Sequence, residues 1–167
     1  MEAIKVYIEN IGRRDEGEII GAWFAAPLDE DEIRERLELN DQHSEYIISD
    51  FESLLPIGEV TDISEINDIY SVLEKLDGMP YFDVIDEIMR EAGMTLDQVY
   101  KSCNDIILYS GIDTEEDLGL YLVEESGLLD GIPDKVSRYF DYASYGRDVA
   151  INGVFIYTSR GYVEVGC

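Results

Sequence analysis

Residues 3–10, AIKVYIEN, set the class of fold that the sequence predicts. Their apolar residues Ile4, Val6 and Ile8 alternate with polar or aromatic ones, and this two-residue period is typical of a strand with one buried face. We therefore expect a strand here, in an N-terminal region that combines strands with a helix.

The segments that follow predict two more strands and one helix. Residues 19–27, IIGAWFAAP, form a short apolar run bounded by glycine and proline, which suits a central strand, and residues 44–52, SEYIISDFE, predict a third strand. Residues 11–18 predict a glycine-punctuated loop. Residues 28–39, LDEDEIRERLEL, predict a helix with Asp29 as its N-cap and acids in its first turn, where they complement the helix dipole.

The middle of the chain predicts helices. Residues 64–76, SEINDIYSVLEKL, place apolar side chains at helical spacing after Ser64 as a cap. Residues 77–80, DGMP, end this helical pattern. In the next segment, residues 83–93, DVIDEIMREAG, the apolar residues again form one helical stripe. Residues 95–103, TLDQVYKSC, predict a third, shorter helix.

The last third returns to a mixture of strands and helices. Residues 105–110 predict a strand, residues 114–127 a helix that ends at a glycine, and residues 132–146 one helix begun by Pro133. Residues 153–166 predict a hairpin that turns at SRG. Together these patterns predict an α+β fold of three small subdomains, namely an α+β subdomain at residues 1–61, a helical one at 62–103 and a mixed one at 104–167.

The sequence is strongly acidic along its whole length. Its 38 acids and 12 bases give a formal net charge of −26 in 167 residues, and 16 of the acids fall in residues 1–61, 10 in residues 62–103 and 12 in residues 104–167. High charge with few aromatics would indicate disorder, but 46% of the residues are hydrophobic and 11% are aromatic, so we expect a folded core. Such a surface repels nucleic acid and anionic lipid and favours a cationic partner.

The helix DVIDEIMREAG concentrates this charge. Asp83, Glu87 and Glu91 follow one another at one-turn spacing with Asp86 beside them, and Arg90 is the only cation of the segment. Carboxylates at this spacing repel one another by roughly 0.2–0.5 kcal/mol per pair, so a helix selected only for stability would interleave lysines. The row is either a solvated surface that favours solubility or an anionic surface for a cationic partner. Duplex DNA carries about one charge per 1.7 Å, so the net charge of the chain matches roughly 44 Å, or about 13 base pairs.

Groups that carry out catalysis are scarce. The single His43 cannot build a histidine metal site and is expected on the solvated surface, and the sequence has neither a glycine-rich phosphate loop nor a Gly-x-Ser-x-Gly motif. Residues 113–124 place acids at positions 1, 3, 5 and 12 of a calcium loop, but Leu118 replaces the glycine at position 6, so a helix is favoured. We expect no enzyme activity, no cofactor and no metal; a carboxylate-pair or metal-dependent enzyme is the weaker alternative.

The remaining features predict a cytoplasmic protein that does not bind membranes. No apolar run reaches the roughly 20 residues that a membrane helix needs, and MEAIKVYIEN lacks the basic start and apolar core of a signal peptide. Cys103 and Cys167 are therefore expected to stay reduced.

The chain resembles the ArdA-type antirestriction proteins, which plasmids and conjugative transposons carry. Four segments carry the resemblance over essentially the whole chain: VYIENIG (residues 6–12), EGEIIGAWFAAPLDEDEI (16–33), LNDQHSEYIISDFE (39–52) and YLVEESGLLDGIPDKVSRYFDYASYGRDV (121–149). The elements GAWF and YGRD at this separation are specific. The resemblance implies an elongated, three-domain, acidic protein without cofactor or catalytic activity, whose homodimer imitates bent B-form DNA. Such a dimer occupies the DNA-binding groove of type I restriction–modification enzymes, on the methyltransferase core.

The resemblance also implies roles for particular residues. The last domain makes the dimer contact in the family, which places Tyr139, Phe140, Tyr142 and Tyr145 at that interface or in its supporting core. Arg147 and the neighbouring aspartate are expected to form an ion pair at the end of their helix.

The acids expected to contact the partner are spread over the chain. They share a position on or beside a predicted helix or strand, and they are Asp29, Asp31, Glu35, Glu38, Asp41, Glu45, Asp50, Glu52, Asp83, Asp86, Glu87, Glu91, Glu115, Glu116, Glu124 and Glu125. An acidic interaction protein or chaperone for other basic nucleic-acid-binding proteins is the alternative function.

Overall fold

The computed structural model describes residues 4–166 and is mixed α+β, as predicted. Its contacts divide the chain into two compact units, one up to Gly78 and one from Met79 onward, which we call the first unit and the second unit. The division falls in the DGMP segment. The finer division into three subdomains stays a prediction. Among residues 4–166, no helix combines the length and the apolar composition that crossing a membrane requires.

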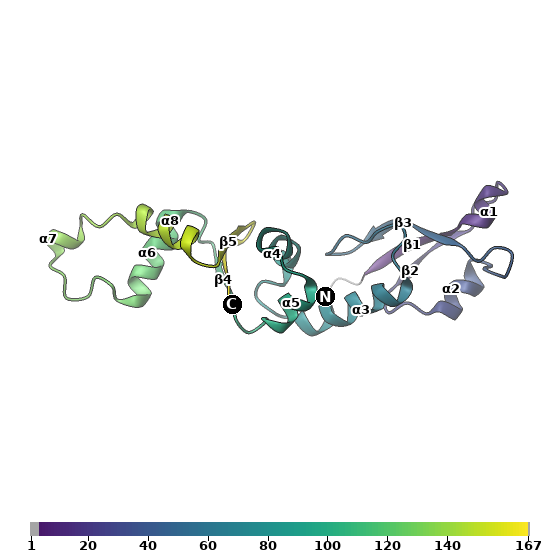
Figure 1. Ribbon diagram of the computed structural model, residues 1–167, viewed down its shortest axis with the longest axis horizontal. Helices are drawn as coiled ribbons and strands as arrows, with labels where there is room; N and C mark the ends of the chain where they lie inside the picture. Colours follow the sequence, from purple (N-terminus) through teal and green to yellow (C-terminus); the bar gives the residue numbers. More distant parts are fainter. Residues whose placement is uncertain (1–3, 167) are drawn as a thin grey trace. The chain divides into compact units, whose positions relative to one another are not determined.

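The first unit contains a three-stranded antiparallel sheet (Figure 1). Its strands are β1 (Lys5–Asn10), β2 (Gly21–Ala25) and β3 (Tyr46–Glu52), and β1 lies in the middle, paired to both others. The three predicted strands are confirmed, but the expectation that the GAWF strand is central is wrong. β2 is an edge strand that buries one face only: Trp23 is 40% exposed, whereas the next residue, Phe24, is 6% exposed.

Two short helices follow the first two strands, α1 (Ile11–Asp15) and α2 (Glu30–Arg36). The loop predicted at residues 11–18 is wrong in its first half, because the Asn10 side chain accepts the backbone N–H of Arg13 at 3.1 Å and starts a helical turn. Asp29 caps α2 as predicted and accepts two backbone N–H groups of its first turn.

The long helix α3 (Ile63–Leu76) completes the first unit. Its Ser64 lies within the first turn and does not cap the helix, because α3 already begins after Asp62. Asn67 joins α3 to the segment before α2: its side chain accepts the N–H of Leu28 at 2.6 Å and donates to the carbonyl of Leu28 at 2.9 Å. This pair of hydrogen bonds fixes the helix against the chain that leads out of the sheet.

The apolar face of β1 forms the core of the first unit. Val6 and Ile8 of β1 are fully buried, and so are Ile33 of α2 and Ile66 of α3. Figure 1 shows α2 and α3 on the same side of the sheet, which is the side of these buried residues. The opposite face of the sheet carries the alternate residues of each strand.

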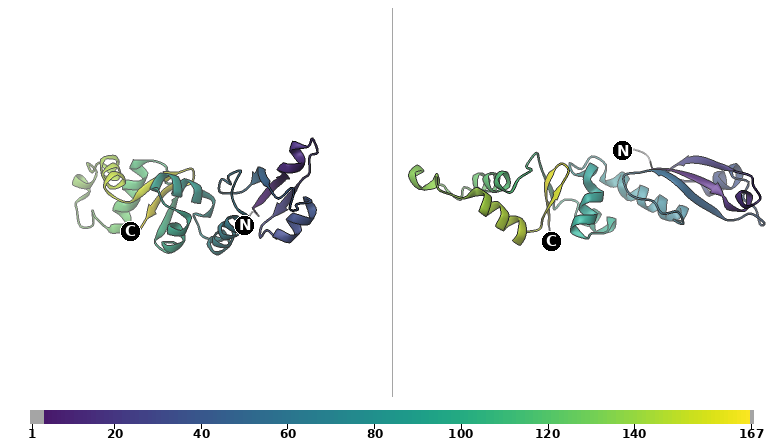
Figure 2. Two further views of the ribbon diagram at one scale, coloured as in Figure 1. Left: turned by 45° about the vertical axis from the view of Figure 1, so that its right-hand side comes forward. Right: turned by 90° about the horizontal axis from the view of Figure 1, so that it is seen from above.

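The second unit combines a second sheet with the remaining helices. Its helical elements are the 3-10 helix η1 (Phe82–Val84), α4 (Ile85–Ala92), α5 (Leu96–Lys101), α6 (Glu115–Ser126), α7 (Asp134–Ser137) and α8 (Tyr142–Asn152). The antiparallel strands β4 (Ile106–Ser110), β5 (Phe155–Thr158) and β6 (Gly161–Val165) lie in the order β4-β6-β5. The predicted β5–β6 hairpin is confirmed, and β5, yellow in Figure 2, packs against α4.

Helices α6 and α8 approach each other closely at two glycines. A β-carbon on Gly119 would collide with the backbone oxygen of Tyr142, and one on Gly146 would collide with the backbone oxygen of Glu115. Neither backbone oxygen can move without moving its helix, so the crossing requires glycine at both positions. Leu118, next to the first glycine, is fully buried in the resulting core.

The single helix predicted at residues 132–146 is wrong. The structure has two helices there, α7 and α8, with a break between Ser137 and Tyr142. Asp141 causes the second start, because its carboxylate accepts the backbone N–H of Ser144 at 2.9 Å and its hydroxyl at 2.7 Å. An aspartate that caps a new helix is hard to distinguish in sequence from one that lies on a helix surface.

Candidate partner-binding surface

The acids of α2 divide into one that holds the helix and others that face solvent. The Asp29 carboxylate is occupied by backbone N–H groups, as described above. Glu32 pairs with Arg36 at 3.1 Å, one turn along the helix. Asp31 and Glu35 are exposed, and within residues 4–166 their carboxylates have no hydrogen-bond or ion-pair partner. These two carboxylates are available to a partner.

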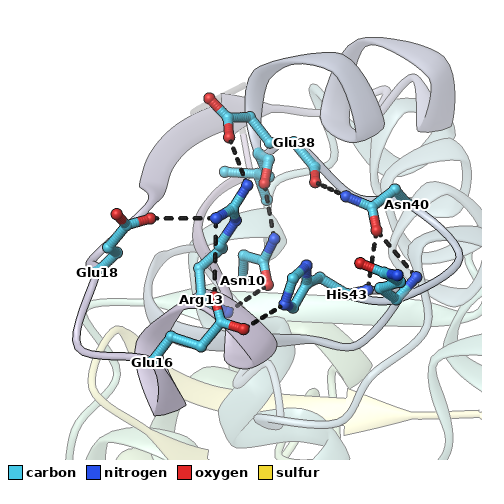
Figure 3. A network of polar contacts seen from close by, with 9 residues as sticks. Asn10, Arg13, Glu16, Glu18, Glu38, Asn40 and His43 are labelled. Carbon is cyan, nitrogen blue, oxygen red and sulfur yellow. Dashed lines mark hydrogen bonds and ion pairs between the residues drawn. The ribbon is translucent and has the colours of Figure 1, made fainter.

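Glu38 belongs to a polar network around Arg13 (Figure 3). The Arg13 guanidinium lies 3.4 Å from Glu38, 3.3 Å from Glu18 and 3.7 Å from Glu16. Asn10 is fully buried beneath it and donates to the backbone carbonyl of the residue before Glu38 at 2.9 Å. One cation therefore pairs with three acids from two segments, and Glu38 is tied to the fold rather than free.

His43 lies in the same network, and the prediction that it is a solvated surface residue is wrong. Its side chain is 15% exposed, and its Nε2 lies 3.0 Å from Oε1 of Glu16. The ring packs over Gly12, where a β-carbon would meet it at 2.5 Å. Asn40 accepts the backbone N–H of His43 at 3.1 Å (Figure 3). His43 therefore holds the loop before β3 against α1.

The acids around β3 lie before its start and among its last residues. Asp41 and Glu45 are exposed, and within the described part of the chain their carboxylates have no partner. Glu52 pairs with Lys5 of the neighbouring strand at 2.7 Å. The carboxylate of Asp50 accepts the backbone N–H of the next residue at 2.8 Å, and no cation in residues 4–166 lies beside it.

The row of acids that runs from η1 into α4 is not the uncompensated ladder that its sequence indicates. Asp83 pairs with Arg160 at 3.0 Å, and Glu91 pairs with Arg90 at 3.1 Å. The Glu87 carboxylate accepts the backbone N–H of Ser159 at 2.7 Å and its hydroxyl at 2.5 Å. Hydrogen bonding by the Ser159 side chain lowers the pKa of Glu87 from its ordinary value. Two of the four acids thus attach the helix to the β5–β6 turn.

Only Asp86 of that row has no hydrogen bond or ion pair within residues 4–166, although its charge also attracts Arg90. The sequence alone could not predict the partners of Asp83 and Glu87. Ser159 lies 72 residues from the carboxylate that it binds, and Arg160 lies 77 residues from Asp83. No local spacing rule connects such distant positions.

The acids of α6 again divide into two kinds. Glu115 accepts from Nε of Arg147 at 3.0 Å, which joins α6 to α8. The ion pair expected between Arg147 and the adjacent aspartate is therefore replaced by one between two helices. Glu116, Glu124 and Glu125 are exposed, and their carboxylates are unpaired in the described chain.

The four aromatic residues predicted at a dimer contact do not share one environment. Phe140 lies with its ring centroid 5.1 Å from that of Tyr142 and 5.7 Å from that of Tyr145, so these three form a cluster. Tyr139 is 83% exposed. Exposed apolar side chains lie near it in sequence, at Leu128, Ile132 and Val136. The cluster supports the fold, whereas Tyr139 is free to contact a partner.

Titratable groups with shifted pKa values hold the fold together. Burial is the main cause that raises the pKa of Tyr81 to about 12, and its hydroxyl donates to the carbonyl of Cys103 at 2.9 Å. Burial also raises the pKa of Tyr109, which donates to Glu164 at 2.6 Å. No three His, Cys, Asp or Glu side chains converge on a common point within residues 4–166. Residues 115–124 lie in α6 and Thr114 caps it, as the helix interpretation predicted.

Comparison with known proteins supports the resemblance seen in the sequence. A comparison with curated proteins finds no match to the chain. The family model described as antirestriction protein (ArdA) matches residues 6–164, which span parts of both units and all of the acids described above. The chain therefore belongs to the ArdA family of antirestriction proteins.

Proposed function

We propose that this antirestriction protein binds type I restriction–modification enzymes as a mimic of DNA. It would occupy the DNA-binding groove on the methyltransferase core and prevent the enzyme from acting on incoming DNA in the cytoplasm. The observation that supports this most is the set of exposed carboxylates without cationic partners, spread over both units of a chain with a net charge of −26. A groove that binds DNA is lined with lysine and arginine, so it attracts such a surface.

The unpartnered acids are the ones that we assign to the partner. They are exposed or half-buried, and they are Asp31, Glu35, Asp41, Glu45, Asp86, Glu116, Glu124 and Glu125. A carboxylate that already accepts two hydrogen bonds or pairs with an arginine has less capacity left for another protein, whereas one that accepts a single backbone N–H, such as Asp50, keeps a free oxygen. Asp29, Glu87 and Glu115 are therefore assigned mainly to the fold.

The active form in this proposal is a homodimer. The exposed apolar residues before α8, with Tyr139 at 83% exposure, offer the kind of surface that association buries. The cluster of Phe140, Tyr142 and Tyr145 would hold that surface in place. A dimer would also double the length of DNA that the charges can match.

A competition experiment tests the proposal. The purified protein is titrated into a type I methyltransferase core bound to a labelled duplex, and fluorescence anisotropy follows the release of DNA. We expect complete displacement near stoichiometric protein. If the duplex stays bound at high excess of protein, the mimic proposal is wrong.

The same assay separates this proposal from a general acidic chaperone for basic proteins. A chaperone would release DNA from unrelated basic DNA-binding proteins with similar potency, because it recognises positive charge alone. A mimic of bent DNA would favour the restriction–modification enzyme. A histone bound to the same duplex is the matched comparison. The family consists of inhibitors, and no enzyme activity is proposed.

A further inference from the structure

The face of the first sheet opposite α2 and α3 carries an aromatic pair, an exposed tryptophan beside a half-buried tyrosine. Strand alternation places Tyr7 and Trp23 on this face, because Val6, Ile8 and Phe24 are buried on the other one. The two residues are directly opposite each other in β1 and β2, and their ring centroids lie 5.6 Å apart. Trp23 is the single tryptophan of the chain and is 40% exposed.

The third strand places a carboxylate beside this pair. Asp50 of β3 is the partner of Tyr7 on its other side, so Trp23, Tyr7 and Asp50 form one row across the sheet. In the next row Lys5 and Glu52 neutralise each other at 2.7 Å. Asp50 accepts one backbone N–H, and no cation in residues 4–166 pairs with it. The row therefore combines an exposed indole and a half-buried tyrosine with a negative charge that is not neutralised locally.

This combination matches the chemistry of an arginine side chain. A guanidinium stacks on the face of an indole, where the ring quadrupole attracts the cation, and its planar N–H groups bind a carboxylate at the same time. Tryptophan, tyrosine and arginine are also the residues that contribute most to protein–protein interfaces. Lysine fits the row less well, because its ammonium is a compact, strongly hydrated charge. DNA does not fit it, because its phosphates are repelled by the acidic chain.

We propose that the row of Trp23, Tyr7 and Asp50 binds an arginine side chain from the DNA-binding surface of the partner protein. The guanidinium stacks on Trp23 and pairs with Asp50. This inference rests on the proposed function, and it adds a specific anchor to an otherwise distributed charge surface. Such an anchor fixes the position of the first unit on the partner, which long-range attraction between charges does not do.

The test compares three single variants in the competition assay described above. Trp23→Ala removes the stacking surface, and Asp50→Asn removes the charge. Phe51→Ala is the matched control, because Phe51 is 39% exposed, lies on a neighbouring strand and belongs to the opposite face. We expect Trp23→Ala to weaken displacement about tenfold or more, Asp50→Asn to weaken it by a few fold, and Phe51→Ala to change it by less than twofold.

Salt separates the two contributions and provides a second measurement. The loss caused by Asp50→Asn should shrink as salt is raised, since salt screens exposed charges. The loss caused by Trp23→Ala should persist, because stacking is screened less. Trp23→Phe retains a ring and should recover part of the affinity. Asp50 is exposed, so Asp50→Asn tests the row even if Trp23→Ala lowers the melting temperature.

Two outcomes would overturn the inference, and they can be told apart. If wild-type protein displaces DNA and folded Trp23→Ala does so equally well, the arginine anchor is wrong and the proposed function stands. If wild-type protein leaves DNA bound, the proposed function is wrong and the inference fails with it.

Discussion

Removing the charge of Glu87 should destabilise the second unit, although local sequence rules predict the opposite. Glu87→Gln keeps the shape of the side chain but weakens the acceptor of two hydrogen bonds from Ser159, at 2.7 and 2.5 Å. Hydrogen bonds to a charged group contribute about 1.5–3 kcal/mol each, and less where solvent reaches them. The same substitution removes the repulsion of Glu87 from Asp83 and Glu91, which raises the free energy of unfolding by roughly 0.2–0.5 kcal/mol per pair. We expect a net loss of about 1 kcal/mol.

The measurement is urea unfolding followed by far-UV circular dichroism, with Asp86→Asn as the control. Asp86 lies on the same helix, but its carboxylate makes no hydrogen bond or ion pair within residues 4–166. Asp86→Asn should therefore change stability little, because it removes both repulsion from the neighbouring acids and a weak attraction to Arg90. In a thermal scan the Glu87→Gln loss corresponds to a decrease of about 4 °C. A Glu87→Gln protein as stable as Asp86→Asn would refute the structural role of the carboxylate.

Three further predictions test other parts of the structure. Because the pKa of Glu87 is lowered in the folded chain, its carboxylate stabilises the fold fully above the ordinary pKa of 4.5, and this stabilisation is lost as the pH falls through the lowered pKa. The difference in the free energy of unfolding between wild type and Glu87→Gln should therefore shrink in acid. A difference that stays constant with pH would contradict this. Gly146→Ala should destabilise the protein by about 2 kcal/mol in urea unfolding, since the methyl group meets the backbone oxygen of Glu115, and unchanged stability would show that the helices can separate without cost. Tyr139→Glu should leave the far-UV circular dichroism spectrum unchanged but convert the proposed dimer to monomer in light scattering at moderate salt, and an intact dimer would place the interface elsewhere.

Sequence periodicity located most of the elements because it reports on one local property, which is the side of a strand or helix that becomes buried. The alternation of Ile4, Val6 and Ile8 places β1, and the Asp29 cap places the start of α2. The same reasoning failed where a polar residue decides the local structure. Asn10 starts α1 inside a predicted loop, and Asp141 divides a predicted helix in two. The same type of amino acid can cap a helix or lie on a helix surface, and only the backbone conformation distinguishes the two roles.

The candidate site was less predictable, because a charge is defined by its neighbours in space. The sequence identifies Glu87 and Glu116 equally as helix-surface acids. In the structure Glu87 binds a turn that is 72 residues away, whereas Glu116 has no partner within residues 4–166. His43 shows the same limit, since its burial depends on a glycine in another segment. The row of Trp23, Tyr7 and Asp50 also requires the pairing order of three strands, which no single stretch of sequence contains.

The division of the acids into bound and unpartnered groups has a consequence for how the proposed complex forms. Long-range attraction depends on the net charge of −26, to which every acid contributes equally, whether or not it is bound within the fold. Contacts in the final complex depend on carboxylates that can approach an arginine or lysine without first losing a partner. Neutralising a bound acid such as Glu52 should therefore slow association at low salt as much as neutralising Glu124 does, since each removes one charge. Only the change at Glu124 also removes a carboxylate available for contact, and so only that change should hasten dissociation. Association and dissociation rates, measured separately for the two variants, thus report on the net charge and on the individual contacts.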